Sequence, residues 1–243
     1  MSKISSLETL VLCGGLGTRL KSQLPPDTPK ILAHINGRPF IKYFFHYLEN
    51  QGIKKIILCT GYGHSAIQEW VNKKYDGDMV IRCSLEKKPL GTGGAIKNAG
   101  KMIDSDTFFV INGDTFFNLD YTTFLNSFLK KEATGAVALC KKSDPSDYGT
   151  IKLDSENRVV LYEEKTTSSN SHNLINAGIY LFKKNVLNDI PSNIKSSLEY
   201  DIIPKIIRKN KSLIYGFQYP GDFIDIGTPK NYQIAFRILK KHN

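Results

Sequence analysis

Strand-like and helix-like stretches alternate through about the first 140 residues of the chain. Short apolar runs predict strands, and longer stretches with apolar residues three or four positions apart predict helices. The predicted strands are residues 8–13, 54–60, 79–84, 107–112 and 133–140, and the predicted helices are residues 40–51, 64–75, 93–102 and 120–131. Such alternation is typical of an α/β fold, in which a mostly parallel sheet has helices on both faces.

The alternation weakens from about residue 148 onward. Here the predicted strands are residues 148–153, 158–163 and 174–182, and the predicted helices are residues 198–209 and 229–240. No linker rich in Pro, Gly or Ser divides the chain, so we expect a single domain of residues 1–243, with halves of about 1–140 and about 141–243. Segment 166–173, TTSSNSHN, is the most loop-like stretch and fits either a mobile flap or a solvated hairpin loop.

A glycine-rich turn follows the first predicted strand, and its glycines are Gly14, Gly15 and Gly17. Glycines let the backbone fold tightly and present bare N–H groups to an anion, although such a turn can also be a plain strand–loop connection. Arg19 adds a fork of donors suited to phosphate oxygens, and Lys30 adds a point charge. The combination predicts a polyphosphate site. A Walker A loop is excluded because no Gly-Lys-Ser/Thr follows, and the dinucleotide fingerprint because Leu20 replaces its third glycine.

Seven short motifs follow one another along nearly the whole chain. They are GGLGTRL with PKILAHINGRPF (14–20 and 29–40), LGTGGAI (90–96), INGD (111–114), EEK (163–165), INAGIY (175–180), SLEYD (197–201) and FIDIGTPKNY (223–232). In this order they resemble the signatures of the sugar-1-phosphate nucleotidylyltransferases. The resemblance implies a Rossmann-like domain of the nucleotide-diphospho-sugar transferase type, with a mixed, mostly parallel central sheet flanked by helices.

The resemblance also implies a reaction, in which an oxygen of a sugar 1-phosphate attacks the α-phosphorus of a nucleoside triphosphate and expels pyrophosphate. Positioning and electrostatic stabilisation carry most of such a rate. Within the family, the wording KPLGTGGAI and the short length are most similar to guanylyltransferases that use GTP and D-glycero-α-D-manno-heptose 1-phosphate, whose product feeds surface glycans. GTP with mannose 1-phosphate, and UTP or dTTP with a hexose 1-phosphate, remain alternatives, as does a non-catalytic nucleotide-sugar sensor.

Two aspartates are candidates for a magnesium site. Asp114 follows the apolar run 108–111, where open α/β sheets bind ligands, and Asp225 lies within the apolar run 223–227. A carboxylate in such a setting needs a partner or a metal ion, and Mg²⁺ prefers carboxylate oxygens. Both aspartates could instead hold turns. The resemblance assigns the family's Mg²⁺ ligands to these two positions.

The resemblance assigns roles to further residues. The catalytic residues are Arg19, Lys30, Asp114 and Lys165; those near the nucleotide are Gly14, Gly15, Gly17, Thr18, Gly91, Thr92 and Gly93; those near the sugar phosphate are Tyr148, Gly149, Glu164, Lys165 and Asn176. Glu86 is added to the nucleotide group from its position just before LGTGGAI, not from the resemblance. Glu86 could accept both N–H donors of guanine, or be a surface residue at a strand end. Glu164 and Lys165 could be an exposed ion pair, and Thr166 replaces the family's usual Pro. Ser197 is predicted to cap the late helix.

Charge, hydropathy and cysteine content limit the classes of ligand, location and metal site that are expected. The net charge of +10 suits an acidic ligand, and the lysine pairs are scattered in a way that favours a solvated surface over nucleic-acid binding. No apolar run is long enough to span a membrane and no signal peptide is present, so the cytoplasm is expected. The four cysteines lack CxxC spacing and are predicted to be buried thiols. A homodimer, if formed, would use the domain's own surface.

Overall fold

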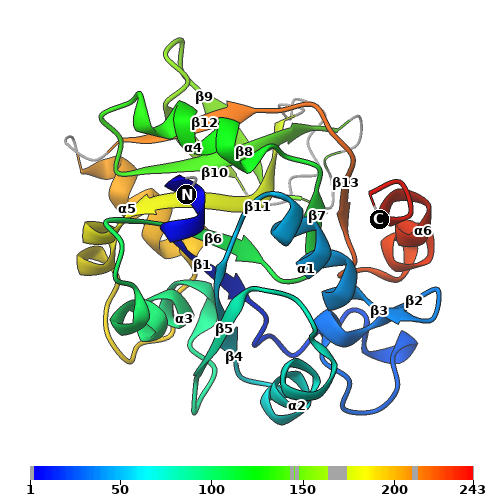
Figure 1. The fold of residues 1–243 in the computed structure, drawn as a ribbon. Helices are drawn as coiled ribbons and strands as arrows, with labels where there is room; N and C mark the ends of the chain where they lie inside the picture. The colour runs from blue at the N-terminus through cyan, green and yellow to red at the C-terminus, as the bar shows by residue number, and fades with distance from the viewer. Residues whose placement is uncertain (1–2, 143–144, 146–147, 164–173, 210–212, 243) are drawn as a thin grey trace.

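The computed structural model describes residues 3–142, 145, 148–163, 174–209 and 213–242. A nine-stranded sheet runs through the molecule (Figure 1). Its strands are β1 (Glu8–Leu12), β4 (Lys55–Thr60), β5 (Val80–Leu85), β6 (Thr107–Asn112), β8 (Gly135–Lys141), β9 (Thr150–Leu153), β10 (Val159–Glu163), β11 (Leu174–Lys183) and β12 (Ile214–Gln218). They lie in the order β10-β9-β11-β6-β1-β4-β5, with β8 also beside β11 and β12 beside β8.

The direction of the strands confirms a mixed, mostly parallel sheet. β1 pairs in parallel with β4 and β6, β4 with β5, and β8 with β12. β11 is antiparallel to its neighbours β6, β8 and β9, and β10 is antiparallel to β9. The sheet therefore continues without a break from the first half of the chain into the second.

The helices are α1 (Phe40–Asn50), α2 (His64–Lys74), α3 (Gly91–Ala99), α4 (Tyr121–Leu129), α5 (Ile203–Arg208) and α6 (Pro229–Leu239). Short helical turns are η1 (Lys3–Ser6), η2 (Lys21–Gln23), η3 (Lys30–Leu32), η4 (Gly100–Met102), η5 (Lys184–Asp189) and the π-helical turn η6 (Leu198–Ile202). Two small sheets pair β2 (His34–Ile35) with β3 (Arg38–Pro39) and β7 (Thr115–Phe117) with β13 (Phe223–Asp225). None of the helices in the described part of the chain has the length and apolar character needed to cross a membrane.

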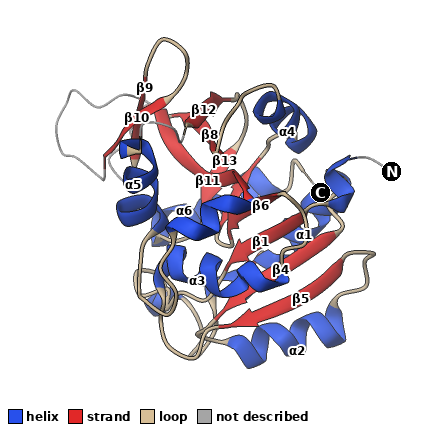
Figure 2. Ribbon diagram, turned by 90° about the vertical axis from the view of Figure 1, so that its left-hand side faces the viewer, coloured by secondary structure: helices blue, strands red, loops and turns tan. Residues whose placement is uncertain are grey.

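The sheet separates two hydrophobic cores, because successive side chains of a strand point to opposite faces. Val11 and Phe109 face the core beneath α1, α4 and α6, whereas Leu10 and Phe108 face the core beneath α3 and α5. Figures 1 and 2 show α1 and α3 on opposite sides of β1 and β4. Since β1 and β6 are buried on both faces, they are fully apolar in the middle and polar only at their ends.

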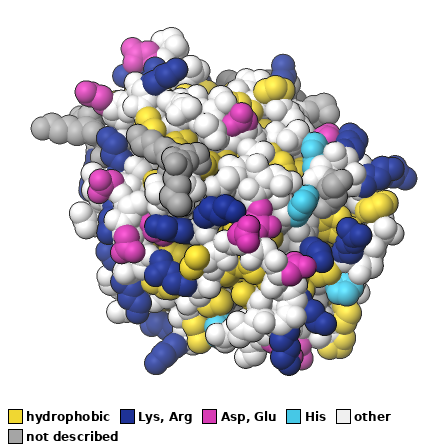
Figure 3. Space-filling model, in the orientation of Figure 1, with side chains coloured by type: hydrophobic (Ala, Val, Ile, Leu, Met, Phe, Trp, Pro, Cys, Tyr) yellow, Lys and Arg dark blue, Asp and Glu magenta, His cyan; other side chains and the backbone are white. Residues whose placement is uncertain are grey.

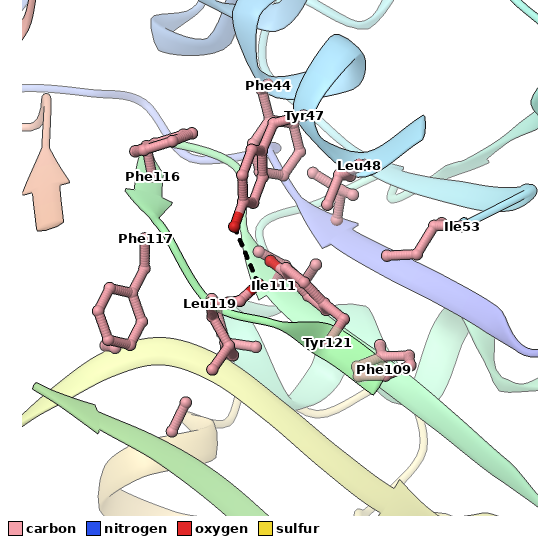
Figure 4. Close-up of a cluster of buried hydrophobic side chains, with 14 of the residues drawn as sticks. Phe44, Tyr47, Leu48, Ile53, Phe109, Ile111, Phe116, Phe117, Leu119 and Tyr121 are labelled. Carbon is pink, nitrogen blue, oxygen red and sulfur yellow. Dashed lines mark hydrogen bonds between the residues drawn. The ribbon is translucent and has the colours of Figure 1, made fainter. Parts of the chain in front are cut away.

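An aromatic cluster anchors the segment that leaves β6 (Figure 4). The Tyr47 hydroxyl donates to the Leu119 carbonyl at 2.9 Å, and the ring of Phe116 packs against Tyr47 at 4.8 Å between centroids. Phe116 and Tyr121 are almost completely buried. Burying a side chain of this size contributes about 1.5–3 kcal/mol. The cluster therefore fixes β7, which begins at the residue after Asp114.

Most predicted elements are confirmed to within a few residues. One predicted helix differs, and strand β12 and the short strands β2, β3, β7 and β13 were not predicted. The helix predicted at 198–209 is divided into η6 and α5, because Pro204 lacks an N–H group and sits at the start of α5. Strand β12 was not predicted, since Gly216 interrupts its apolar run. A Cβ atom at Gly216 would lie 2.6 Å from a methyl carbon of Leu153, so the glycine allows close packing. The four cysteines are free thiols, as predicted, but only Cys59 and Cys140 are buried, whereas Cys13 and Cys83 are partly exposed.

Candidate active site

Two adjoining cavities lie where β1, β4 and β6 end. The first cavity has a volume of about 700 Å³ and the second about 460 Å³. Asn112, the last residue of β6, lines both of them. The predicted site residues of the first cavity are Gly14, Gly15, Gly17, Thr18, Lys30, Glu86, Gly91, Thr92 and Asp114; those of the second are Arg19, Tyr148, Gly149, Asn176 and Asp225. Glu164 and Lys165 lie outside the described residues.

The glycine turn forms one wall of the first cavity. Gly17 has a φ of +62°, and a Cβ atom there would lie 2.8 Å from Lys30 Cγ. At Gly14 a Cβ atom would lie 2.9 Å from the backbone nitrogen of Gly61. A side chain at either position would push the turn away from its neighbours. Glycine is therefore required for the turn to pass this close to Lys30 and to the end of β4.

Four charged side chains meet between the cavities. Lys30 forms an ion pair with Asp114, while Asp225 Oδ1 accepts the Gly227 N–H at 2.6 Å. A Cβ atom at Gly227 would lie 3.4 Å from Lys30 Nζ and 3.5 Å from a guanidinium nitrogen of Arg19. The structure thus places these four sequence-predicted residues close together.

Backbone pairing brings the two aspartates together. Thr115 of β7 pairs with Asp225 of β13, and the Ile226 N–H donates to the Asp114 carbonyl at 2.9 Å. Burial, and next the nearby charge of Asp114, raise the pKa of Asp225 to about 6, although the Gly227 N–H, Lys30 and Arg19 oppose this rise. Within the described ranges, no further His, Cys, Asp or Glu joins these two carboxylates in a metal-binding group.

Glu86 and the start of α3 form a further part of the lining of the first cavity. Glu86 Oε2 accepts the Leu90 N–H at 3.0 Å, and burial raises the pKa of Glu86. Gly93 does not line the cavity. Its N–H donates to the Ser196 carbonyl at 2.9 Å, so it holds α3 against the segment before η6. Gly91, with a φ of +72°, lets the same carbonyl approach.

An irregularity in β11 shapes the second cavity. The pairing of β11 with β8 shifts register between Asn176 and Tyr180. Gly178 lies inside this irregularity with a φ of +68°, and a Cβ atom there would lie 2.6 Å from Asn112 Nδ2. The Gly178 N–H donates to Asn176 Oδ1 at 2.9 Å. The bulge therefore brings Gly178 directly against Asn112, which lines both cavities.

Several lining residues were not assigned from the sequence: Leu16, Tyr62, Lys87, Lys88 and Lys195 in the first cavity, Thr115, Tyr162, Glu199, Tyr200 and Phe223 in the second, and Asn112 in both. Lys87 and Lys88 are exposed, as predicted for a surface pair, but they also line the cavity. Their position directly after Glu86, a predicted nucleotide-binding residue, could have indicated that they line the same cavity. Elsewhere on the face shown in Figure 3, Lys and Arg lie among Asp and Glu side chains.

Comparisons with known proteins agree with this geometry. The family model described as "Nucleotidyl transferase" matches residues 8–242. D-glycero-alpha-D-manno-heptose 1-phosphate guanylyltransferase of Campylobacter jejuni is 40% identical over 93% of this chain and 97% of its own length. The protein of that name from Aneurinibacillus thermoaerophilus is 36% identical over 97% of this chain and 100% of its own. The crystal structure of HddC from Yersinia pseudotuberculosis complexed with GMP-PN superposes with a TM-score of 0.84, at 36% identity, over 98% of this chain and 100% of HddC.

Proposed function

Because the chain belongs to the nucleotidyl transferase family of enzymes, we propose that it is a guanylyltransferase that transfers GMP from GTP to D-glycero-α-D-manno-heptose 1-phosphate. The product would be a GDP-heptose for surface glycan synthesis, and pyrophosphate would be released. The observation that carries the proposal is the pair of cavities joined by Arg19, Lys30, Asp114 and Asp225. The two relatives with this activity in their names match nearly end to end.

The first cavity is the proposed GTP site and the second the proposed sugar-phosphate site. Backbone N–H groups of the glycine turn would bind the triphosphate, and Lys30 and Arg19 would neutralise it. An oxygen of the sugar phosphate forms a bond to the α-phosphorus, the bond from that phosphorus to the bridging oxygen breaks, and the electron pair leaves with pyrophosphate. The site needs no nucleophilic protein side chain, because an oxygen of the sugar phosphate is itself the nucleophile.

Nucleotidyltransferases generally use a divalent metal ion, and we propose Mg²⁺ held by Asp114 and Asp225. The donor set fits, because Mg²⁺ usually takes one or two carboxylates and completes its shell with phosphate oxygens and water. Two neighbouring carboxylates repel each other, as the raised pKa of Asp225 indicates. When bound, the ion would polarise the α-phosphate, while Lys30 and Arg19 hold the charge of the remaining phosphates.

Guanine is proposed to be recognised by Glu86. Its Oε2 already accepts the Leu90 N–H, which orients the carboxylate within the cavity. Each carboxylate oxygen has two lone pairs, so both oxygens retain capacity for the N1–H and N2–H donors of guanine. Uracil and thymine offer one N–H on that edge and would use this capacity only in part.

For the sugar phosphate we retain the sequence-based proposals. Tyr148, Gly149 and Asn176 line the second cavity, and the Tyr148 hydroxyl accepts from Asn231 Nδ2 at 2.9 Å, which fixes its ring. Glu164 and Lys165 remain proposed ligands of the sugar and its phosphate on the family resemblance. The single domain and the homodimer likewise remain predictions.

The test is pyrophosphate release with Mg²⁺, measured for GTP, UTP, CTP, dTTP and ATP against heptose, mannose and glucose 1-phosphates. Release confined to GTP with the heptose phosphate supports the proposal. Release with GTP and mannose 1-phosphate, or with another pair, would retain the chemistry and replace the substrate. Triphosphate binding without release on the whole grid would favour a nucleotide-sugar sensor. EDTA should abolish the activity and Mg²⁺ restore it.

A further inference from the structure

A chain of hydrogen bonds connects the two cavities through Glu199. Glu199 lines the second cavity, and Thr92 lines the first. The Thr92 hydroxyl donates to Glu199 Oε2 at 2.8 Å, and the Ser197 hydroxyl donates to the same oxygen at 3.0 Å. The Tyr180 hydroxyl donates to Glu199 Oε1 at 3.1 Å. One carboxylate thus contacts the nucleotide wall, the sheet and the sugar cavity together.

The groups at the two ends of this series of hydrogen bonds determine which hydroxyl groups donate to Glu199. The Leu198 N–H donates to Thr92 Oγ1 at 2.7 Å, so the Thr92 proton must point toward Glu199. Asn176 Nδ2 donates to the Tyr180 oxygen at 2.5 Å, so the Tyr180 proton also points toward Glu199. Tyr180 is fully buried, and burial together with the charge of Glu199 raises its pKa well above the usual value. Tyr180 therefore stays protonated and orients Glu199 at any physiological pH.

The segment that carries Glu199 is attached rigidly to the start of α3. The Ser196 carbonyl accepts N–H groups from Gly93 at 2.9 Å and Gly94 at 3.3 Å, and the Ser196 N–H donates to Leu90 at 2.8 Å. Ser197 caps η6, as predicted from the sequence, by accepting the N–H of Tyr200 at 3.2 Å. The backbone around Glu199 is therefore held before any ligand binds, which lowers the entropic cost of binding.

Glu199 retains unused acceptor capacity on the cavity side. Among the described residues, Oε2 accepts two hydroxyl protons and Oε1 accepts one, so one lone pair of Oε1 is available. The amide of Asn176, which lines the same cavity, is already committed, because it donates to Tyr180 and Tyr162 and accepts from the Gly178 N–H. A sugar presents several O–H donors and is uncharged away from its phosphate, so an oriented anionic acceptor suits it.

We propose that Glu199 accepts a hydrogen bond from a hydroxyl group of the sugar 1-phosphate and is a sugar-recognition residue of the second cavity. This inference rests on the proposed function, since it assigns a ligand atom within the same site. Thr92 and Tyr180 are positioning residues, which act through Glu199. The sequence motif SLEYD thus combines a helix cap at Ser197 with a ligand contact two residues later.

The test is calorimetric binding of heptose 1-phosphate and, separately, of a non-hydrolysable GTP analogue to the full chain. Glu199→Gln keeps the shape of the side chain and removes its charge. It should weaken sugar-phosphate binding about tenfold and leave the GTP analogue within about twofold. Asp201→Asn is the matched control, because Asp201 accepts the Ser197 N–H at 2.7 Å in the same turn but lines neither cavity. It should change neither affinity.

A second measurement separates recognition from structure. With monodeoxy analogues of the sugar phosphate, the effect of Glu199→Gln should disappear for the analogue that lacks the contacted hydroxyl. Equal weakening of both ligands, or an undiminished effect with every analogue, would overturn the proposal, as would a wild-type chain that binds no sugar 1-phosphate. Should Glu199→Gln fail to fold, Tyr180→Phe takes its place and should weaken sugar-phosphate binding selectively, to a smaller degree. If Tyr180→Phe bound both ligands with wild-type affinity, the proposal would be contradicted. A wild-type chain that binds the sugar phosphate without releasing pyrophosphate would contradict only the proposed function.

Discussion

Replacing Asp225 by Asn should make the free protein more stable while it removes activity. Burial and the neighbouring Asp114 raise the pKa of Asp225 from 3.8 to about 6 in the folded state. The folded protein then binds a proton more tightly than the unfolded chain, so its stability falls as the pH rises through the window from about 4 to about 6. Above that window Asp225 is ionised in the folded state, and the folded protein is destabilised by the full free-energy cost of the buried charge.

The shift corresponds to at most about 3 kcal/mol at neutral pH, because each pKa unit is worth about 1.4 kcal/mol. For a chain of this size, that free energy corresponds to an increase of up to roughly 6–12 °C in the melting temperature. Asn at position 225 keeps an oxygen that can accept the Gly227 N–H, so the main contact of the side chain survives. Turnover should fall at least about a hundredfold, since the site loses one of its two carboxylates.

The assay is thermal unfolding of wild-type and Asp225→Asn protein in EDTA between pH 4 and pH 8. The variant should melt higher at pH 8, and most of the difference should be gone at pH 4, where Asp225 is protonated in the folded state and only partly ionised in the unfolded chain. Added Mg²⁺ should stabilise the wild type more than the variant. Asp222→Asn is the control with the opposite sign, because His242 and Lys241 lower the pKa of Asp222. A variant that melts at or below the wild type at pH 8, or a difference independent of pH, would refute the reasoning.

Four further substitutions test separate parts of the site and the fold. Asp114→Asn should reduce turnover about 10²–10³-fold with an unchanged circular dichroism spectrum, and turnover near wild type would remove Asp114 from the metal site. Lys165→Ala should raise the KM for the sugar 1-phosphate, whereas an equal rise for GTP would give Lys165 another role. Glu86→Gln should reduce the preference for GTP over UTP in kcat/KM about tenfold, and an unchanged preference would place guanine elsewhere. Tyr47→Phe should lower the free energy of unfolding in urea by about 1 kcal/mol, because the Leu119 carbonyl loses its donor.

The sequence was sufficient for the parts of the molecule that local pattern determines. Apolar runs located β1, β4, β6 and β8, and Ser197 was identified as the cap of the late helix because serine is favoured at helix N-caps. Strand β12 was missed because it is short and contains Gly216, whose role is to admit the side chain of Leu153. A glycine that is needed by a neighbouring strand leaves no local signal.

In the candidate site, too, local motifs could be identified from the sequence, whereas contacts between distant segments could not. The charged residues of the motifs could be named from the sequence, but the backbone pairing that brings Asp225 to Asp114 could not. Lys195 reaches the first cavity from a loop without any motif, so no local pattern indicated it. Gly93 lies inside a predicted nucleotide-binding motif, yet its N–H donates to the Ser196 carbonyl. The first N–H groups of a helix have no acceptor within the helix, so the protein itself can supply one in place of a ligand.

The position of β11 determines the order in which the sheet can be completed. β6 and β8 follow each other along the chain with α4 between them, yet β11 lies between them in the sheet. During synthesis the ribosome releases β1, β4, β5 and β6 first, and these can pair at once. The far edge of β6 must then wait for residues 174–183 before β8 and β12 can join. A chain interrupted after β8 would expose an unpaired, apolar edge of β6, and such an intermediate is a substrate for chaperones or aggregation.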